Sequence, residues 1–233
     1  EQSIVGQRIC KTIVRTPQLR WPIPQNLAAR LDNNTITQVQ RRAKYLLLNT
    51  QTGTLIIHLG MSGCLKIQDS EQAPIKHDHV ELVFSSKQCL RYHDPRRFGA
   101  ILWTDNPPLS HPLLANLGVE PLHASFNPNY LHNIAKQRRC NIKQLIMNSK
   151  IVVGVGNIYA NESLFVSAIR PTTPANKLSL QRCKRLVEAI KAVLQHAIHC
   201  GGTTLKDFHN TEGKPGYFAQ ELSTALVLNT PPW

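Results

Sequence analysis

Long apolar runs are missing from this sequence, which argues against a membrane-spanning protein. No run approaches the roughly 18 apolar residues that a transmembrane helix needs. Glu1 is not followed by the basic and then apolar stretches of a secretory signal, so we expect a cytoplasmic location. The length of 233 residues predicts one or two domains, and a hydrophobic content of 42% is enough for sizeable cores.

Paired cysteines are also missing. The six cysteines are scattered along the chain, and no two of them form a C-x-x-C pair. Such pairs are typical of zinc sites, and regular spacings are typical of disulfide frameworks. We therefore expect no metal ion, no disulfide framework and no cofactor in this chain.

Acidic residues are scarce. The sequence has 14 Asp and Glu residues and 27 Lys and Arg residues, which gives a formal net charge of +13. This excess favours a polyanionic partner such as nucleic acid or an acidic membrane face. On charge alone, a basic surface without a particular partner is the alternative.

Short β-type runs fill the sequence from about residue 35 to residue 103, and several alternate apolar with polar residues. Turn signals such as QTG and SSKQ separate them at hairpin distances. We therefore predict antiparallel sheets packed as a sandwich or a barrel. The runs are TITQVQ, YLLLN, TLIIHLG, CLKIQ, HVELVF, CLRYH and AILW.

A helical half follows a proline-rich stretch. Between Asn106 and Asn129, five prolines and the lack of a sustained period predict a linker. Beyond it, the apolar spacing predicts a long helix at about residues 179–199, which a pair of glycines would end. Shorter helices are predicted at about residues 141–149 and from about Asn157. The predicted fold class is therefore α+β.

The sequence GVGN at residues 154–157 connects the two shorter helices. Glycine lets the backbone approach a ligand closely and adopt a positive φ. The first amides of a helix point outward at its positive dipole end. The segment is therefore a candidate phosphate-binding loop in a helix-turn-helix type of unit. An ordinary tight turn, with Asn157 as the N-cap of the next helix, is the alternative.

Six motifs occur in order along the chain, namely RRAKYLLL, HLGMSG, KHDHVEL, DPRRFGA, VGVGNIYANE, and GGTTLKDF with GKPGYFAQEL. Together they resemble the bacterial formamidopyrimidine-DNA glycosylases, which remove oxidised purines such as 8-oxoguanine from DNA. The resemblance covers about residues 4–222. The related endonuclease VIII branch, which acts on oxidised pyrimidines, is disfavoured because DPRRFG and GKPGYFAQEL are closer to the purine branch.

The resemblance implies a domain organisation and a partner. An N-terminal antiparallel β-sandwich would occupy residues 1–112, a linker residues 113–124, and a helical domain with a helix-two-turn-helix residues 125–222. A divergent tail would occupy residues 223–233. Double-stranded DNA with an oxidised purine would lie in the cleft between the domains, bound by a monomer.

The resemblance also implies roles for residues of the N-terminal half. Lys44 resembles the lysine that holds phosphate in the lesion pocket. Phe98 would wedge into the base stack, Met61 would fill the remaining gap, and Arg96 would face the orphaned cytosine. Emptying a stack costs a few kcal/mol, which an apolar wedge and an arginine donor offset. The alternatives are a solvated lysine and an ordinary surface turn begun by the Asp-Pro pair, with a half-buried Phe98.

Further DNA contacts are implied along the rest of the chain. Glu162 is expected to cap or brace the phosphate-binding loop, and the segment ending at Tyr217 resembles the loop that closes over the flipped base. Plain surface charges are the alternative for the lysines and for Glu162. The implied DNA contacts besides Lys44 and Arg96 are His77, Arg97, Lys143, Asn157, Lys206 and Tyr217.

Two features of the family have no counterpart here. The family's chemistry begins at an N-terminal proline, whose amine attacks the sugar C1′, followed by a glutamate. This chain starts with EQSIVGQ, further along by register, and Glu1 is not that glutamate. The family's four-cysteine zinc ribbon follows GYFAQEL, where this chain reads STALVLNTPPW.

Two hypotheses follow for the function. In the first, the natural protein is a bifunctional glycosylase and abasic-site lyase, and this chain is a fragment without the nucleophile, in which Lys44 has a supporting role. In the second, the chain is a catalytically inactive remnant that recognises lesions.

Overall fold

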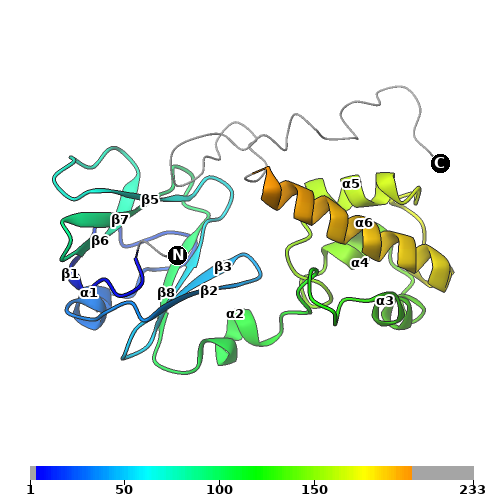
Figure 1. Ribbon diagram of the computed structural model, residues 1–233, viewed down its shortest axis with the longest axis horizontal. Coiled ribbons are helices and arrows are strands. Elements are labelled where there is room, and N and C mark those ends of the chain that lie inside the picture. The colour runs from blue at the N-terminus through cyan, green and yellow to red at the C-terminus, as the bar shows by residue number, and fades with distance from the viewer. Residues whose placement is uncertain (1–3, 201–233) are drawn as a thin grey trace. The chain divides into compact units, whose positions relative to one another are not determined.

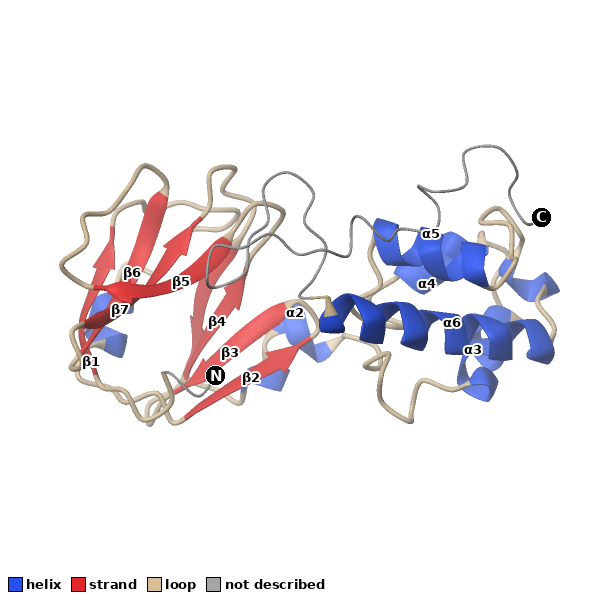
Figure 2. Cartoon of the chain, turned by 45° about the horizontal axis from the view of Figure 1, so that its top comes forward, coloured by secondary structure: helices blue, strands red, loops and turns tan. Residues whose placement is uncertain are grey.

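The structure is a computed structural model that describes residues 4–200. Contacts divide the described chain into two compact units, which meet in sequence between Ala115 and Asn116. The first unit holds the strands and the second holds the longer helices (Figures 1 and 2).

Two four-stranded antiparallel sheets form the first unit (Figure 1). One sheet has the strand order β1-β6-β7-β5, and the other has the order β2-β3-β4-β8. A single core of apolar side chains from both sheets, including Leu82 and Leu90 from one and Leu55 and Ile101 from the other, makes the unit a sandwich. The strands are β1 (Ile9–Val14), β2 (Gln38–Arg42), β3 (Tyr45–Asn49), β4 (Thr54–His58), β5 (Cys64–Asp69), β6 (Asp78–Phe84), β7 (Gln88–His93) and β8 (Ala100–Thr104).

Each of the seven predicted β-type runs overlaps one strand, β2 to β8. Strand β1 was not predicted. Its pairing with β6 is shifted between Ile9 and Lys11, and such a bulge breaks the two-residue period by which strands are recognised. The short helix α1 (Leu27–Leu31) follows β1 and buries Leu27 and Leu31 in the same core.

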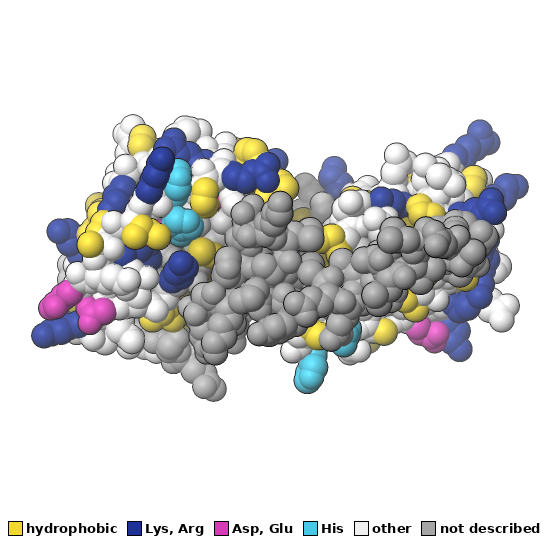
Figure 3. Space-filling view, turned by 90° about the horizontal axis from the view of Figure 1, so that it is seen from above, with side chains coloured by type: hydrophobic (Ala, Val, Ile, Leu, Met, Phe, Trp, Pro, Cys, Tyr) yellow, Lys and Arg dark blue, Asp and Glu magenta, His cyan; other side chains and the backbone are white. Residues whose placement is uncertain are grey.

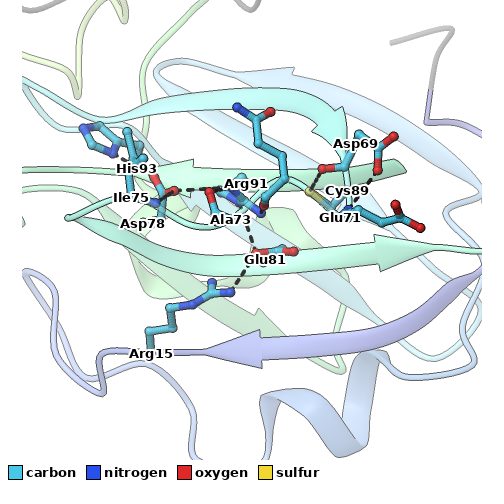
Figure 4. A network of polar contacts seen from close by, with 11 residues as sticks. Arg15, Asp69, Glu71, Ala73, Ile75, Asp78, Glu81, Cys89, Arg91 and His93 are labelled. Atoms are coloured by element: carbon cyan, nitrogen blue, oxygen red, sulfur yellow. Dashed lines mark hydrogen bonds and ion pairs between the residues drawn. The ribbon is translucent and has the colours of Figure 1, made fainter. Parts of the chain in front are cut away.

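A buried ionic network fixes the first sheet (Figure 4). The Arg91 guanidinium lies 3.1 Å from a Glu81 oxygen and 3.6 Å from an Asp78 oxygen, and all three side chains are almost fully buried. Arg15, the residue after β1, lies 2.9 Å from Glu81, and His93 Nδ1 lies 2.8 Å from Asp78. Burial would raise the pKa of Glu81, but the hydrogen bonds and charges of Arg91 and Arg15 outweigh it and lower that pKa.

The second unit packs its helices around one apolar core. Leu186 and Ile190 of the long helix lie in this core with Leu145 of α4 and Leu164 of α5. The helices are α3 (Pro128–Ala135), α4 (Ile142–Met147), α5 (Asn157–Val166) and α6 (Leu180–His199), with a single 3-10 turn, η2 (Ala175–Lys177), before α6. The predicted fold class, α+β with an antiparallel sandwich followed by helices, is confirmed.

The proline-rich stretch has more regular structure than the sequence indicated. A 3-10 turn, η1 (Pro108–Ser110), and the short α2 (Pro112–Ala115) lie within it. At its end, Asn127 caps α3 by accepting a hydrogen bond from the Tyr130 amide at 2.9 Å, and Pro128 takes the first helical position. Pro128, one of the five prolines that suggested a linker, therefore marks the start of a helix. In the part of the chain that the structure describes, no helix is long and apolar enough to cross a membrane.

Candidate nucleic-acid interface

A pocket of about 250 Å³ opens beside the β2–β3 turn of the first unit. The turn residue Ala43 has a φ of +55°, and its carbonyl accepts a hydrogen bond from the Arg41 guanidinium at 2.9 Å. This turn presents Lys44 at the pocket, opposite the end of β4. The lining residues are Arg41, Ala43, Lys44, Tyr45, Leu46, His58, Leu59 and Gly60.

The basic side chains Arg41, Lys44 and His58 line the pocket, although most of its wall is apolar. Lys44 is exposed by surface area, but the surrounding walls partly desolvate its ammonium and lower its pKa. Burial, and then the charges of Lys44 and Arg20, also lower the pKa of His58, which Asp94 only partly opposes. His58 Nδ1 accepts a hydrogen bond from the Gly60 amide at 3.0 Å, so the neutral imidazole carries its proton on Nε2. Such a pocket is suited to an anion.

The wedge loop, residues 94–99, connects β7 to β8 and exposes an aromatic side chain. Phe98 is 45% exposed, and the Arg96 guanidinium stacks over its ring at 4.7 Å. Met61, in the loop after β4, is 62% exposed. A side-chain carbon at Gly60 would come within 2.6 Å of the Phe98 carbonyl carbon and the Gly99 amide, so the two loops touch backbone to backbone. The fold therefore brings together two loops that are far apart in sequence and that each carry an exposed apolar residue.

His77 lies beside this loop. Its φ is +76°, its carbonyl accepts a hydrogen bond from the Asp94 amide at 3.1 Å, and its ring packs edge-on against those of His79 and His93. Partial desolvation, and then the charge of Lys76, lower the pKa of His77. The sequence-predicted contacts His77, Arg96 and Arg97 are thus neighbours at one end of β7.

The loop before α5 has the predicted features of an anion site, with one correction. Gly154 has a φ of +80°, whereas Gly156 is extended. The reading of Asn157 as N-cap is wrong, because Gly156 occupies that position and Asn157 is the first residue of the helix. Gly156 has no side chain with which to cap this end. Asn157 is exposed, and the opening amides of α5 have no acceptor inside the helix.

Buried valines and a neighbouring strand-like segment hold this loop. The Val153 amide bonds the Val119 carbonyl at 3.0 Å, and the Val119 amide bonds the Ile151 carbonyl at 3.1 Å. The Tyr130 hydroxyl of α3 donates to the Ile151 carbonyl at 2.8 Å. Val152 and Val153 are fully buried. The glycine loop is therefore anchored, and its backbone is fixed before any ligand arrives.

The remaining predicted residues are spread along the chain. Lys143 is half-buried in the first turn of α4, where its amide bonds the Pro171 carbonyl at 3.3 Å. Glu162 is buried in α5, and its bracing role stays a prediction. Lys206 and Tyr217 lie outside the described residues. Figure 3 shows Lys and Arg side chains spread over the described surface of both units.

Sequence reasoning missed three residues of the pocket region, namely Arg20, Tyr45 and His58. Burial raises the pKa of Tyr45, and the charge of Arg20 only partly opposes it. Burial and the charge of Lys44 lower the pKa of His58, and the charge of Arg20 acts in the same direction. His58 opens the motif HLGMSG and Tyr45 follows Lys44, so their places in quoted motifs were the available signal. Nothing in the sequence marked Arg20.

The cysteines do not fit a four-cysteine zinc site. Cys64, Cys89 and Cys183 are buried in the cores, and Cys10 and Cys140 are exposed on different units. In residues 4–200, no cluster of three or more His, Cys, Asp or Glu side chains could hold a metal ion.

The sandwich with its wedge loop and the helical unit with its glycine loop define the class of helix-two-turn-helix DNA glycosylases. Residues 1–101 match the family model "Formamidopyrimidine-DNA glycosylase N-terminal domain", and residues 117–209 match "Formamidopyrimidine-DNA glycosylase H2TH domain". The chain belongs to the formamidopyrimidine-DNA glycosylase family. The predicted resemblance is thereby confirmed.

Individual relatives agree with this assignment. The formamidopyrimidine-DNA glycosylase of Thioalkalivibrio sulfidiphilus is 53% identical over 222 residues, which is 95% of this chain and 82% of that protein. The Photobacterium profundum protein of the same name is 56% identical over 219 residues, covering 94% and 81%.

Solved structures show the same fold. The MutM (Fpg) protein of Thermus thermophilus has a TM-score of 0.83 at 31% identity, covering 95% of this chain and 81% of that chain. The Lactococcus lactis Fpg in complex with DNA containing an abasic site has a TM-score of 0.86 at 28% identity, covering 95% and 82%.

Proposed function

We propose that the protein to which this chain belongs binds double-stranded DNA with an oxidised purine. It would remove the base and cleave the abasic strand through a Schiff base. The Lactococcus relative was solved with DNA containing an abasic site, and a point mutant of it with DNA containing Fapy-dG. For this chain, the observation that carries the proposal is the contact between the two loops bearing Met61 and Phe98, beside a cationic pocket.

Each part of the first unit has a task in this proposal. Phe98 and Met61 fill the gap left by the extruded nucleotide, and Arg96 offers donors to the orphaned base. Arg96 already stacks on Phe98, so the two residues enter the duplex as one preformed group. Lys44 and the His58 Nε2–H bind the phosphates that crowd together where the backbone bends.

The second unit supplies phosphate binding without reading sequence. The opening amides of α5 and the Asn157 side chain bind one flanking phosphate at the positive end of the helix dipole. Lys143 binds a neighbouring phosphate as a point charge. Because these contacts are made with the sugar-phosphate backbone of the DNA, they position the duplex for insertion of Phe98 and Met61 and do not select a base.

Base removal and strand cleavage need an unprotonated amine at C1′, because a Schiff base forms only from a neutral amine. In the family that amine belongs to an N-terminal proline. Lys44 is the described alternative, since desolvation lowers its pKa. Its place among phosphate-binding groups supports a binding role instead.

Borohydride trapping on a duplex with 8-oxoguanine tests the proposal. A polypeptide of these 233 residues is expected to bind a duplex with an abasic-site analogue but to give no trapped complex. The same polypeptide, preceded by a family segment that begins Pro-Glu, is expected to give one, and a third version would also carry a zinc ribbon.

Three results would contradict the proposal in different ways. Trapping by the 233 residues that Lys44→Met abolishes would make Lys44 the nucleophile. Binding without trapping by every extended version would favour the alternative, a lesion-recognising protein without catalysis. Equal affinity for damaged and undamaged duplex in every version would reject both.

A further inference from the structure

A fully buried carboxylate lies under the expected DNA-contacting loops of the first unit. We infer that Asp94 is the positioning residue that holds the Met61 loop and the wedge loop, residues 94–99, in register with each other before DNA binds. The inference rests on the proposed function, because it concerns the residues expected to fill the gap in the base stack. Asp94 itself is 0% exposed and does not touch DNA.

The carboxylate of Asp94 joins the two loops directly. Its Oδ1 accepts a hydrogen bond from the Ser62 hydroxyl at 2.7 Å, and Ser62 follows Met61 in sequence. Its Oδ2 accepts from the Gly99 amide at 2.9 Å, and Gly99 follows Phe98. Each oxygen therefore holds the residue next to one wedge side chain.

Ser62 adds a second link between the loops. Besides donating to Asp94, its oxygen accepts a hydrogen bond from the Arg96 amide at 3.3 Å. The side chain is buried, so water does not substitute for these partners. The Met61 loop thus binds the wedge loop both through Asp94 and at Arg96.

The backbone of Asp94 extends the same arrangement to the histidines. Its amide donates to the His77 carbonyl at 3.1 Å. Its carbonyl accepts from the Arg97 amide at 3.3 Å and lies 2.8 Å from His79 Nε2, which must therefore carry a proton. The expected contacts His77 and Arg97 are consequently held by the same residue as the wedge.

Close packing leaves the two loops no room to move independently. A side-chain carbon at Gly99 would lie 1.7 Å from the Tyr92 hydroxyl, and one at Gly63 would lie 2.9 Å from that same oxygen. The Tyr92 hydroxyl in turn donates to Asp94 Oδ2 at 3.1 Å. Because interiors of this density do not deform continuously, a shift of one loop requires a shift of the other.

The preformed arrangement of Met61 and Phe98 should affect affinity only for DNA in which a nucleotide has left the base stack. Undamaged duplex bound through phosphates does not need Met61 and Phe98 in the gap, whereas an extruded site does. Ordering the loops on binding would cost affinity that a preorganised site does not lose. Weakening Asp94 should therefore lower the preference for damaged DNA rather than DNA binding as such.

The test compares affinities of the full chain for an abasic-site analogue duplex and for undamaged duplex. Asp94→Asn and Ser62→Ala are expected to lower the ratio of the two affinities about tenfold, the size of one lost hydrogen bond to a carboxylate. Glu81→Gln is the matched control, because Glu81 is an equally buried carboxylate bonded to Arg91 and Arg15, away from both loops. It should leave the ratio unchanged.

A double variant shows whether Asp94 acts by positioning Phe98 or by stabilising the fold in general. If Asp94 acts through the wedge, then Asp94→Asn should change the ratio less than about twofold when Phe98 is already alanine. In the DNA-free protein, Asp94→Asn should also speed hydrogen exchange at the Gly99 amide.

Three outcomes would overturn the inference. The first is an affinity ratio that Asp94→Asn and Ser62→Ala leave unchanged. The second is a decrease of the ratio in Glu81→Gln as large as that in Asp94→Asn. The third is a double variant in which the decreases caused by Asp94→Asn and Phe98→Ala multiply. A parent chain without any preference for the abasic-site analogue would instead reject the proposed function, before any variant is made.

Discussion

At the scale of single residues, the candidate site depends on side chains whose surroundings alter ordinary chemistry. His58 is a neutral donor at pH 7 because burial and two nearby cations lower its pKa. A histidine whose pKa is lowered on folding destabilises the fold as the pH falls below the ordinary value, since the unfolded chain takes up the proton more readily. Phe98 stays exposed although it is aromatic, and its ring is covered on one face by Arg96. A shifted histidine pKa and an exposed aromatic ring are both typical of ligand-binding residues.

Replacing Phe98 by alanine should weaken binding to lesion-bearing duplex about tenfold or more, and binding to undamaged duplex much less. The reason is that only the extruded state needs an apolar wedge, which offsets a few kcal/mol of lost stacking. Fluorescence anisotropy with the two duplexes measures both affinities. Leu109→Ala is the matched control, since Leu109 is similarly exposed in the same unit but lies outside both loops. Equal losses on the two duplexes would return Phe98 to an ordinary surface residue.

At the scale of elements, a residue with positive φ lies on each side of α5. One is a glycine, which adopts this conformation easily, and the other is an alanine, which does not. Gly154 precedes the helix with a φ of +80°, and its missing side chain would meet only Pro121 at 3.9 Å. Ala168 follows the helix with a φ of +53°, while the Ile169 amide bonds the Leu164 carbonyl at 2.9 Å. This is the usual glycine-ended termination of a helix, here occupied by alanine. Glycine therefore fits the loop before α5, and alanine strains the turn after it.

Gly154→Ala should lower the free energy of unfolding by about 1–2 kcal/mol, because a left-handed conformation strains an L-residue even where there is space. It should also weaken binding to damaged and undamaged duplex alike, since the loop binds phosphate rather than the lesion. Ala168→Gly is the paired variant and should stabilise the exposed turn by up to about 1 kcal/mol without changing affinity. Denaturant unfolding and DNA titration measure these effects. A neutral Gly154→Ala would show that the loop relaxes to a negative φ.

At the scale of the whole molecule, charge decides how the protein meets DNA. The formal net charge of +13 is large for 233 residues, and only 14 acidic residues offset the cations. Two of the acidic side chains, Asp78 and Glu81, are also buried in ion pairs, so they contribute little to the surface field. Phosphate binding should accordingly dominate affinity, and the wedge should decide preference.

Affinity for duplex DNA should fall linearly with salt on logarithmic axes, with a slope of about 0.9 per phosphate contact. Lys143→Ala should reduce that slope by about one contact. Lys87→Ala is the control, because Lys87 is exposed in the β6–β7 turn, at the opposite end of β7 from Asp94. A flat salt response, or an equal change in both variants, would contradict phosphate-dominated binding.

Local pattern was enough to predict most elements. Strands β2 to β8 follow from alternation between turn signals, α6 follows from its apolar spacing, and the glycine loop follows from GVGN between two helices. These are short-range properties of the chain, because a period or a turn residue acts on its immediate neighbours. The ordered motifs likewise carried the family and the expected contacts, including Lys44 and Phe98.

Contacts between distant segments were decided only by tertiary structure. Asp94 looked like the start of a surface turn, yet packing buries it and pairs it with Ser62, 32 residues away in sequence. His58 and Arg20 became part of the Lys44 pocket region because β4 and the segment after β1 fold next to the β2–β3 turn. Burial removes water from such groups and makes their partners obligatory, and no local period encodes which partner the fold will bring.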